Sequence, residues 1–482
     1  MRARVSPPTL PLALPLALAA LALALVALAA WRATCVLAGA DVDTDAYAHH
    51  MIARAILADP RDLAVHWVWL PLFHYAQVPL VALGGSLESV RWINVVLAAA
   101  TPVLLFEYVR RTARSGESRL APEAIALLAA LFAAACPIVM QMGTTGQPEP
   151  LFALLILGVA IAVERDRAGW TAGLLGAAVL LRYEAWASLG VVALVVALRR
   201  GRGWIAVAVP VALILAWAAL RRPVDGRWFA FLRQTKEFAN DALHQRGGVL
   251  SDLLYYPVQT AWRVTGSTLP LAVFGVARTI RQQGWRFVLV LAACLGFVSL
   301  TWITRSSLGL DRHFVCVVPL YATFSAQGAA AVADVVARFA RRPAVGRTLA
   351  GVVALASLAG LLVQLDVWMG FWRGSVARGW PERRAIAAYL DALPAGRTIF
   401  CDDATIELLT HVDRRRFDRH WTDDPHTWEL VHEAVRRGEP VYVATWRRKM
   451  DGHEGEGDLA FTAGTDPGDP DHTGVAVLRV DP

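Results

Sequence analysis

Long apolar stretches follow one another along the chain as far as residue 366, and polar residues gather in the segments between them. A membrane-spanning helix needs about 20 apolar residues, and the first stretch, 9–31, is longer than the ~7–15-residue core of a signal peptide. Further stretches of this kind cover residues 88–109, 122–141, 148–164, 168–182, 184–198, 203–220, 258–277, 287–304, 313–337 and 347–366. The pattern predicts a mainly α polytopic bundle of about eleven transmembrane helices.

Composition agrees with this reading. Of the 482 residues, 56% are hydrophobic and only 18% are charged, whereas a soluble chain carries about 25% charged residues. These values exclude a water-soluble enzyme of this size, and an intrinsically disordered chain as well. The arginines are scattered at helix ends and form no basic stripe, so we expect no nucleic-acid partner.

Charge between the stretches predicts the topology. Segment 68–85 is apolar but contains Pro71 and Pro79, and we interpret it as an interfacial segment. The Arg-rich loops then share the cytoplasmic side, as membrane proteins prefer; they include 110–119, 165–167, 199–202, 278–286 and 338–347. Arg221 and Arg222 are the exception, on the outer side. We therefore expect a multi-pass protein of a bacterial cytoplasmic membrane, with its active site facing outside.

The composition becomes polar near the C-terminus, which predicts a membrane domain at 1–370 and a soluble extracytoplasmic domain at 371–482. Helix-like and strand-like patterns alternate in the second part, at 382–392, 398–400, 424–437 and 440–445. They predict a small α/β domain, with a loop over the Gly-, Asp- and Pro-rich tail 451–473. This domain contains no acidic cluster like that of the first outer loop, so we expect it to shape the acceptor site rather than to catalyse.

Three carboxylates, Asp41, Asp43 and Asp45, follow the first span within five residues. In an extended chain all three point the same way, and in a helix Asp41 and Asp45 share a face. A carboxylate here can take a proton from an attacking hydroxyl, or the cluster, with His49, can bind Mg²⁺ or Mn²⁺. The structural alternative is that Asp43 or Asp45 caps a helix running to about residue 57.

Other polar groups lie at the outer ends of later spans. They are Glu149, the pair Arg182 and Glu184, and the pair Arg312 and His313. Each could be an interface anchor or a local ion pair, such as Arg312 with Asp311. Their position on one predicted side favours a shared site instead, in which Arg312 grips a phosphate with two hydrogen bonds and His313 adds another.

These motifs, taken in order, resemble the GT-C superfamily of polytopic membrane glycosyltransferases, close to the protein mannosyltransferase and aminoarabinose-transferase type. The matching segments are Thr44-Asp45-Ala46-Tyr47 with Ala53-Arg54, Trp69 to Tyr75, Val90 to Asn94, Gln147 to Leu151, Gly173 to Glu184, and Arg312 to Pro319. The resemblance covers roughly residues 10–335, and the C-terminal segment has no match. Many relatives carry two adjacent acids where this chain has Thr44-Asp45, so either Asp43 or Asp45 is the base.

The resemblance implies an inverting transfer of a sugar from a polyprenyl-phosphate donor to a hydroxyl of a glycan, lipid or protein, at the membrane surface. It implies Asp45, with Asp43, as the catalytic pair and possible metal ligands for Mg²⁺ or Mn²⁺. The donor phosphate would bind Arg312, His313 and Arg182. Further candidates for substrate or metal contacts are Glu149, Glu184, Tyr47 and His49.

Two other function classes fit the composition. A transporter or flippase for a lipid-linked glycan would have repeats with broken helices that meet at mid-membrane, but here the charged residues cluster at helix ends. A sensor would carry a ligand site in the C-terminal domain, where the sequence shows none. The chain has no G-x-x-x-x-G-K-[ST] motif, which disfavours an ATP-driven pump.

Overall fold

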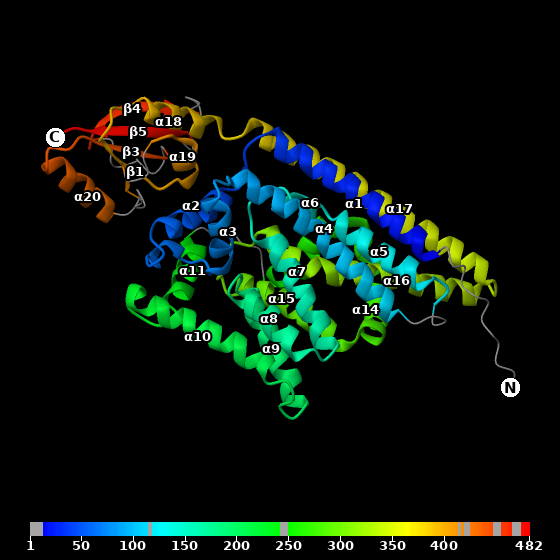
Figure 1. The fold of residues 1–482 in the computed structure, drawn as a ribbon. Helices are drawn as coiled ribbons and strands as arrows, with labels where there is room; N and C mark the ends of the chain where they lie inside the picture. The colour runs from blue at the N-terminus through cyan, green and yellow to red at the C-terminus, as the bar shows by residue number, and fades with distance from the viewer. Residues whose placement is uncertain are drawn as a thin grey trace. The chain divides into compact units, whose positions relative to one another are not determined.

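The computed structural model describes residues 13–113, 118–241, 249–412, 416–418, 425–446, 455–464 and 474–482. Residues 9–12 of the first expected span, residue 424 of an expected helix, and 451–454 and 465–473 of the expected loop lie outside them. The chain divides into two compact units (Figure 1). The first consists of Met1–Leu37 and Ala53–Arg373, and the second of Ala38–Ile52 and Gly374–Pro482.

The described residues of the first unit are mainly helical, as the apolar pattern predicts. Its helices are α1 (Ala13–Ala38, which ends in the second unit), α3 (Leu72–Ala82), α4 (Leu87–Thr112), α5 (Pro122–Ala134), α6 (Pro137–Met142), α7 (Glu149–Glu164), α8 (Ala168–Val179), α9 (Glu184–Leu198), α10 (Ile205–Asp225), α11 (Ala230–Asp241), α12 (Val249–Leu254), α13 (Ala261–Thr265), α14 (Leu269–Gln283), α15 (Trp285–Ile303), α16 (Val318–Phe339) and α17 (Pro343–Arg378, which also ends in the second unit). Within the described residues, six helical segments are long and apolar enough to cross a membrane, and three shorter apolar helices accompany them. The protein is an integral membrane protein.

Two expected spans are interrupted. The stretch 122–141 splits because α5 ends at Ala134 and Pro137 opens α6; proline has no N–H to continue a helix. The stretch 258–277 contains a π-helix (Tyr255–Thr260), α13, a 3₁₀ turn (Gly266–Thr268) and then α14. Gly266 has φ +47°, a conformation that suits glycine and ends α13.

The apolar segment 68–85 forms a short helix. Helix α3 has 11 residues and begins directly after Pro71. At about 1.5 Å per residue it is roughly 16 Å long, about half of the ~30 Å hydrocarbon thickness. It is too short to span, as the interfacial interpretation requires.

Helices α14 and α16 pack closely along each other. A Cβ atom on Gly275 would lie 1.8 Å from the carbonyl oxygen of Phe324, and one on Gly328 would lie 1.9 Å from that of Leu271. Small residues let helix backbones approach in this way inside membranes. The two glycines are therefore required by the helix contact.

The second unit contains a five-stranded sheet of order β2-β1-β3-β5-β4. Its strands are β1 (Thr398–Cys401), β2 (Phe417–Asp418), β3 (Val441–Trp446), β4 (Asp458–Ala463) and β5 (Val475–Val480), and its helices α18 (Pro381–Asp391), α19 (Ala404–Leu409) and α20 (Pro425–Arg436). Strand β1 is parallel to β2 and β3, whereas β5 is antiparallel to β3 and β4. Phe400 packs with α20 and Ile399 with α18, so alternate side chains of β1 face opposite layers. The predicted α/β domain is confirmed.

The expected loop over 451–473 is wrong for residues 458–463, which form β4. This strand pairs with β5 from Asp458 opposite Arg479 to Ala463 opposite Val475, with an irregularity between Leu459 and Phe461. Its backbone hydrogen bonds to β5 stabilise it. Local composition, rich in Gly and Asp, carries no signal of that partner.

Candidate active site

The first unit brings together the polar residues expected at the outer ends of its helices. They come from four places in the chain: Glu149 opens α7, Arg182 lies in the turn between α8 and α9, Glu184 opens α9, and Arg312 and His313 lie in the 3₁₀ helix Asp311–Val317. A carboxylate in the first turn of a helix is favoured by the partial positive charge there. Glu149 and Glu184 therefore lie at the N-terminal ends of α7 and α9.

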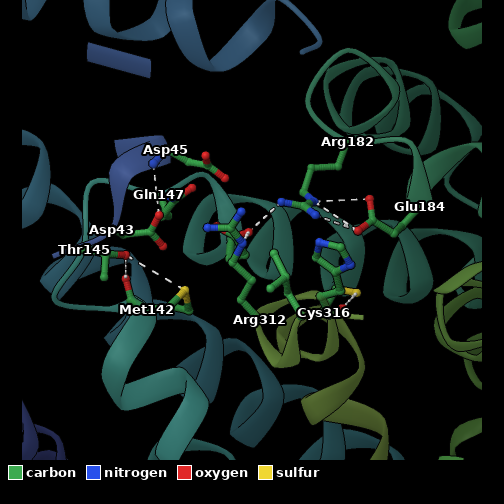
Figure 2. Close-up of polar contacts among 12 residues, drawn as sticks. Asp43, Asp45, Met142, Thr145, Gln147, Arg182, Glu184, Arg312 and Cys316 are labelled. Carbon is green, nitrogen blue, oxygen red and sulfur yellow. Dashed lines mark hydrogen bonds and ion pairs between the residues drawn. The ribbon is translucent and has the colours of Figure 1, made fainter. Parts of the chain in front are cut away.

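Arg182 is at the centre of this cluster. Its Nη1 lies 2.6 Å from Oε1 of Glu149, and its Nη2 lies 2.8 Å from Oε1 of Glu184. Its Nε is 3.2 Å from both carboxylate oxygens of Glu184, so that pair is bidentate (Figure 2). The carboxylate side chains are only 2% and 5% exposed. Buried acids of this kind need such partners to stay charged.

Arg312 pairs with the same carboxylate oxygen of Glu149. Its Nε lies 3.6 Å from Oε1 of Glu149. Asp311, its neighbour in sequence, pairs instead with Arg263, whose Nη2 lies 2.6 Å from Oδ1 of Asp311. Asp311 therefore has an ion-pair partner remote in sequence, and Arg312 pairs with Glu149. The cluster contains two guanidiniums and two carboxylates, which balance in charge.

Side chains of α4 hold the turn before Glu149 in place. The side-chain amide of Asn94 donates to the carbonyl oxygens of Thr145 and Gln147, each at 2.7 Å. Arg91 donates from Nε to the carbonyl oxygen of Thr144 at 2.8 Å. The motif from Val90 to Asn94 thus has a structural role, which is to fix the turn that presents Glu149.

His313 is positioned by residues that the sequence did not identify. Its Nδ1 lies 3.4 Å from the hydroxyl of Tyr256 and 3.5 Å from the hydroxyl of Ser307. Tyr256 is fully buried and also donates to the carbonyl oxygen of Leu310 at 3.2 Å. Tyr256 belongs to the π-helix, 57 residues away from His313 in sequence. No local motif joins them.

The acidic loop belongs to the second unit, which we describe by itself. The backbone N–H of Asp43 donates to Oδ1 of Asp41 at 3.0 Å, and that of Asp45 donates to Oδ1 of Asp43 at 3.1 Å. Helix α2 (Thr44–Ala58) begins directly after Asp43, so Asp43 is its N-cap. Asp45 lies in the first turn with a partly exposed side chain. The capping role that the sequence left open therefore falls to Asp43.

Tyr47 and His49 lie further along α2, and each is 4% exposed. Within the described ranges, no group of three or more His, Cys, Asp or Glu side chains comes together to hold a metal ion. Oxygens of Asp41 and Asp43 already accept backbone hydrogen bonds. Mg²⁺ or Mn²⁺ at Asp43 and Asp45 therefore stays a prediction, and no reaction step below uses it.

No family model and no curated protein matches the chain. Among solved structures it is similar to ArnT from Cupriavidus metallidurans bound to undecaprenyl phosphate, with TM-score 0.61, 15% identity, and coverage of 94% of this chain and 97% of that one. The chain has an ArnT-like fold. The apo state of the same ArnT matches with TM-score 0.59 and 16% identity, over 94% of this chain and 96% of that one.

A second solved protein has a similar fold. The Archaeoglobus fulgidus oligosaccharyltransferase, in complex with Zn and sulfate, matches with TM-score 0.52 and 12% identity, over 89% of this chain and 68% of that one. The ArnT match covers nearly both whole chains. The likeness to the ArnT structure therefore extends into the C-terminal domain, for which sequence motifs gave no match.

Proposed function

We propose that this protein is a membrane glycosyltransferase that transfers a sugar from a polyprenyl-phosphate donor to a hydroxyl acceptor on the outer side of the membrane. One observation carries the proposal: the guanidiniums of Arg182 and Arg312 flank the buried carboxylate of Glu149. The ArnT-like fold and the undecaprenyl phosphate bound to ArnT support it. A lipid-linked donor needs no nucleotide-binding domain, because its leaving group is already anchored in the bilayer.

Arg312 is the residue proposed to bind the donor phosphate. Arg182 is engaged by Glu184 through a bidentate pair and by Glu149 at 2.6 Å. The ion pair of Arg312 with Glu149 is longer, at 3.6 Å. We therefore assign the phosphate to Arg312, whose ion pair with Glu149 is the longer of the two. Two charge-assisted hydrogen bonds from its planar fork would then hold the phosphate oxygens.

The proposed reaction is a single displacement. Asp45 takes the proton of the acceptor hydroxyl, whose oxygen then bonds to the anomeric carbon while the bond from that carbon to the phosphate oxygen breaks. The anomeric centre inverts, and polyprenyl phosphate leaves with its electron pair. Arg312 and His313 offset the charge on this leaving group. Asp43 keeps α2 capped, so that Asp45 stays in its first turn.

A transfer assay with purified protein in liposomes tests this proposal. The donors are undecaprenyl-phosphate hexose, pentose and aminosugar, each radiolabelled in the sugar, and the acceptors are envelope glycolipids and glycans. We expect one donor to release undecaprenyl phosphate and to label an acceptor, and Arg312→Ala to abolish both. Donor that crosses the bilayer intact would instead indicate the flippase. Intact, untransported donors in every case would contradict the proposal.

A further inference from the structure

The C-terminal domain has a buried ion pair at the end of its first strand. Asp403 follows β1, and its Oδ2 lies 2.5 Å from Nε of Arg383. Both residues are buried, at 7% and 4% exposure. The other oxygen of Asp403 accepts a hydrogen bond from the backbone N–H of Thr405 at 2.9 Å, which caps α19. Arg383 is thereby fixed at the end of β1.

Arg383 in turn fixes the indole of Trp380. The guanidinium carbon of Arg383 lies 3.8 Å from the centre of the Trp380 ring, a cation–π contact within the ~6 Å range of such pairs. Trp380 stands directly before α18, and Arg383 lies in the first turn of that helix. The indole N–H of Trp380 donates to the backbone carbonyl oxygen of Asp41 at 2.8 Å. One side chain of the domain thus holds the backbone of the acidic loop.

From Asp41 the contacts continue to the candidate base. Oδ1 of Asp41 accepts the N–H of Asp43, and Oδ1 of Asp43 accepts the N–H of Asp45. The sequence of contacts from Asp403 to Asp45 is therefore unbroken, and every member belongs to the second unit.

A close backbone contact anchors the same loop a second time. A Cβ atom on Gly39 would lie 2.6 Å from the carbonyl oxygen of Val376, near the end of α17. Only glycine fits this approach without displacing one of the two backbones. The loop is therefore held at Gly39 and at Asp41 by residues that lead into the C-terminal domain.

We propose that Trp380 is a positioning residue for Asp45, and that the C-terminal domain sets the orientation of the catalytic loop through it. This inference rests on the proposed function, because it concerns the base of that reaction. It gives the domain a role in turnover, beyond the effect on acceptor choice expected from sequence. A displacement of about 1 Å in a reacting group can cost ~10²-fold in rate, so a single lost anchor can be measured.

Trp380→Phe tests the anchor, because it keeps an aromatic ring beside Arg383 and removes the N–H donor. We expect kcat to fall about 10- to 100-fold, while the affinity for undecaprenyl phosphate is unchanged because Arg312 and Arg182 belong to the first unit. Trp428→Phe is the matched control. Trp428 is buried on α20 in the core of the same domain, and its loss should leave kcat unchanged. Wild-type kcat in Trp380→Phe, or an equal fall in both variants, would overturn the proposal.

A double variant separates positioning from general damage to the fold. If Trp380 acts through Asp45, Trp380→Phe should lower turnover in wild type and have no further effect in Asp45→Asn. If Trp380→Phe lowered turnover by the same factor in wild type and in Asp45→Asn, the proposal would be overturned. Gly39→Ala supplies an independent variant if Trp380→Phe does not fold, with the same expected fall in kcat and the same overturning result.

The outcome also distinguishes this inference from the proposed function. Full turnover in both Asp43→Asn and Asp45→Asn would refute the base assignment, and the positioning role with it. Loss of turnover in Asp45→Asn with wild-type turnover in Trp380→Phe would refute the positioning role alone.

Discussion

Arg182 and Glu149 are 33 residues apart in sequence, yet their Nη1 and Oε1 atoms lie 2.6 Å apart. Because Glu149 also pairs with Arg312, and Arg182 with Glu184, the positive charges of the cluster are balanced before any substrate binds. If the proposed donor phosphate binds here, it must compete with Glu149 for the guanidiniums. The proposal therefore predicts that Glu149 influences the affinity for the donor.

Glu149→Gln should strengthen donor binding. Removing one negative charge leaves the cluster with a net charge of +1, and a unit charge about 4 Å away is worth several kcal/mol at most in a partly buried site. We expect the Kd for undecaprenyl phosphate to fall at least about tenfold at low salt. Fluorescence titration in detergent measures it, with Glu123→Gln on α5 as control. Weaker binding would mean that Glu149 supports the phosphate rather than competing with it.

Arg312→Lys should weaken donor binding even though the charge is kept. Lysine lacks the planar fork that matches two phosphate oxygens. We expect the Kd to rise about tenfold, which corresponds to the loss of one charge-assisted hydrogen bond. Arg263→Lys is the matched control, since Arg263 pairs with Asp311. Its Kd should stay at the wild-type value. An unchanged Kd in Arg312→Lys would remove Arg312 from the phosphate site.

The stability of the segment that links α2 and α3 should depend on pH through His66. Its Nδ1 lies 2.8 Å from Nδ1 of His74, and burial, with the charge of Arg221, lowers the pKa of His66 to about 3. An unfolded histidine binds a proton near pH 6.5. The unfolded state therefore binds more protons between about pH 6.5 and 3, and stability falls as the pH decreases through that window.

From this one group, the free energy of unfolding should change by at most about 1.4 kcal/mol per pH unit. Thermal unfolding in detergent at pH 7.5, 6 and 5 measures it. His66→Gln should lower the Tm at pH 7.5 and flatten its dependence on pH. Parallel curves for the variant and the wild type would show that His66 does not carry the effect.

The contact between α14 and α16 should tolerate no side chain. Gly275→Ala or Gly328→Ala forces a methyl group against a backbone carbonyl, and we expect a loss of about 1–3 kcal/mol in stability, as for other overpacked sites. Gly296→Ala on α15 is the control, because nothing lies within 4 Å of the added Cβ. The Tm in detergent compares the three. Equal Tm values would refute the close helix contact.

The sequence predicted features that depend on local pattern. Apolar runs about 20 residues long located the helices, and the polar shift after residue 370 located the α/β domain. The candidate residues of the bundle were also found locally, because acids and arginines at helix ends stand out in apolar surroundings. Arg182, Glu149 and Arg312 do come together.

Partners remote in sequence could not be predicted. The sequence left a local pair of Arg312 with Asp311 as one alternative. In the folded chain Asp311 pairs with Arg263, 48 residues away. The ring of His313 is held by Tyr256 from an interrupted helix. Strand β4 exists because β5 pairs with it. Each of these contacts depends on how separate elements pack, which periodicity along one segment does not encode.

The acidic loop supplies the most direct measurement. Asp43 caps α2 through its Oδ1, a role that asparagine fills equally well, whereas Asp45 is the proposed base. We expect Asp43→Asn to keep near wild-type turnover and Asp45→Asn to lose ~10²–10⁴ in rate, both with unchanged affinity for undecaprenyl phosphate. The measurement is sugar transfer from the radiolabelled polyprenyl-phosphate donor under single-turnover conditions. Full activity in Asp45→Asn would contradict the account.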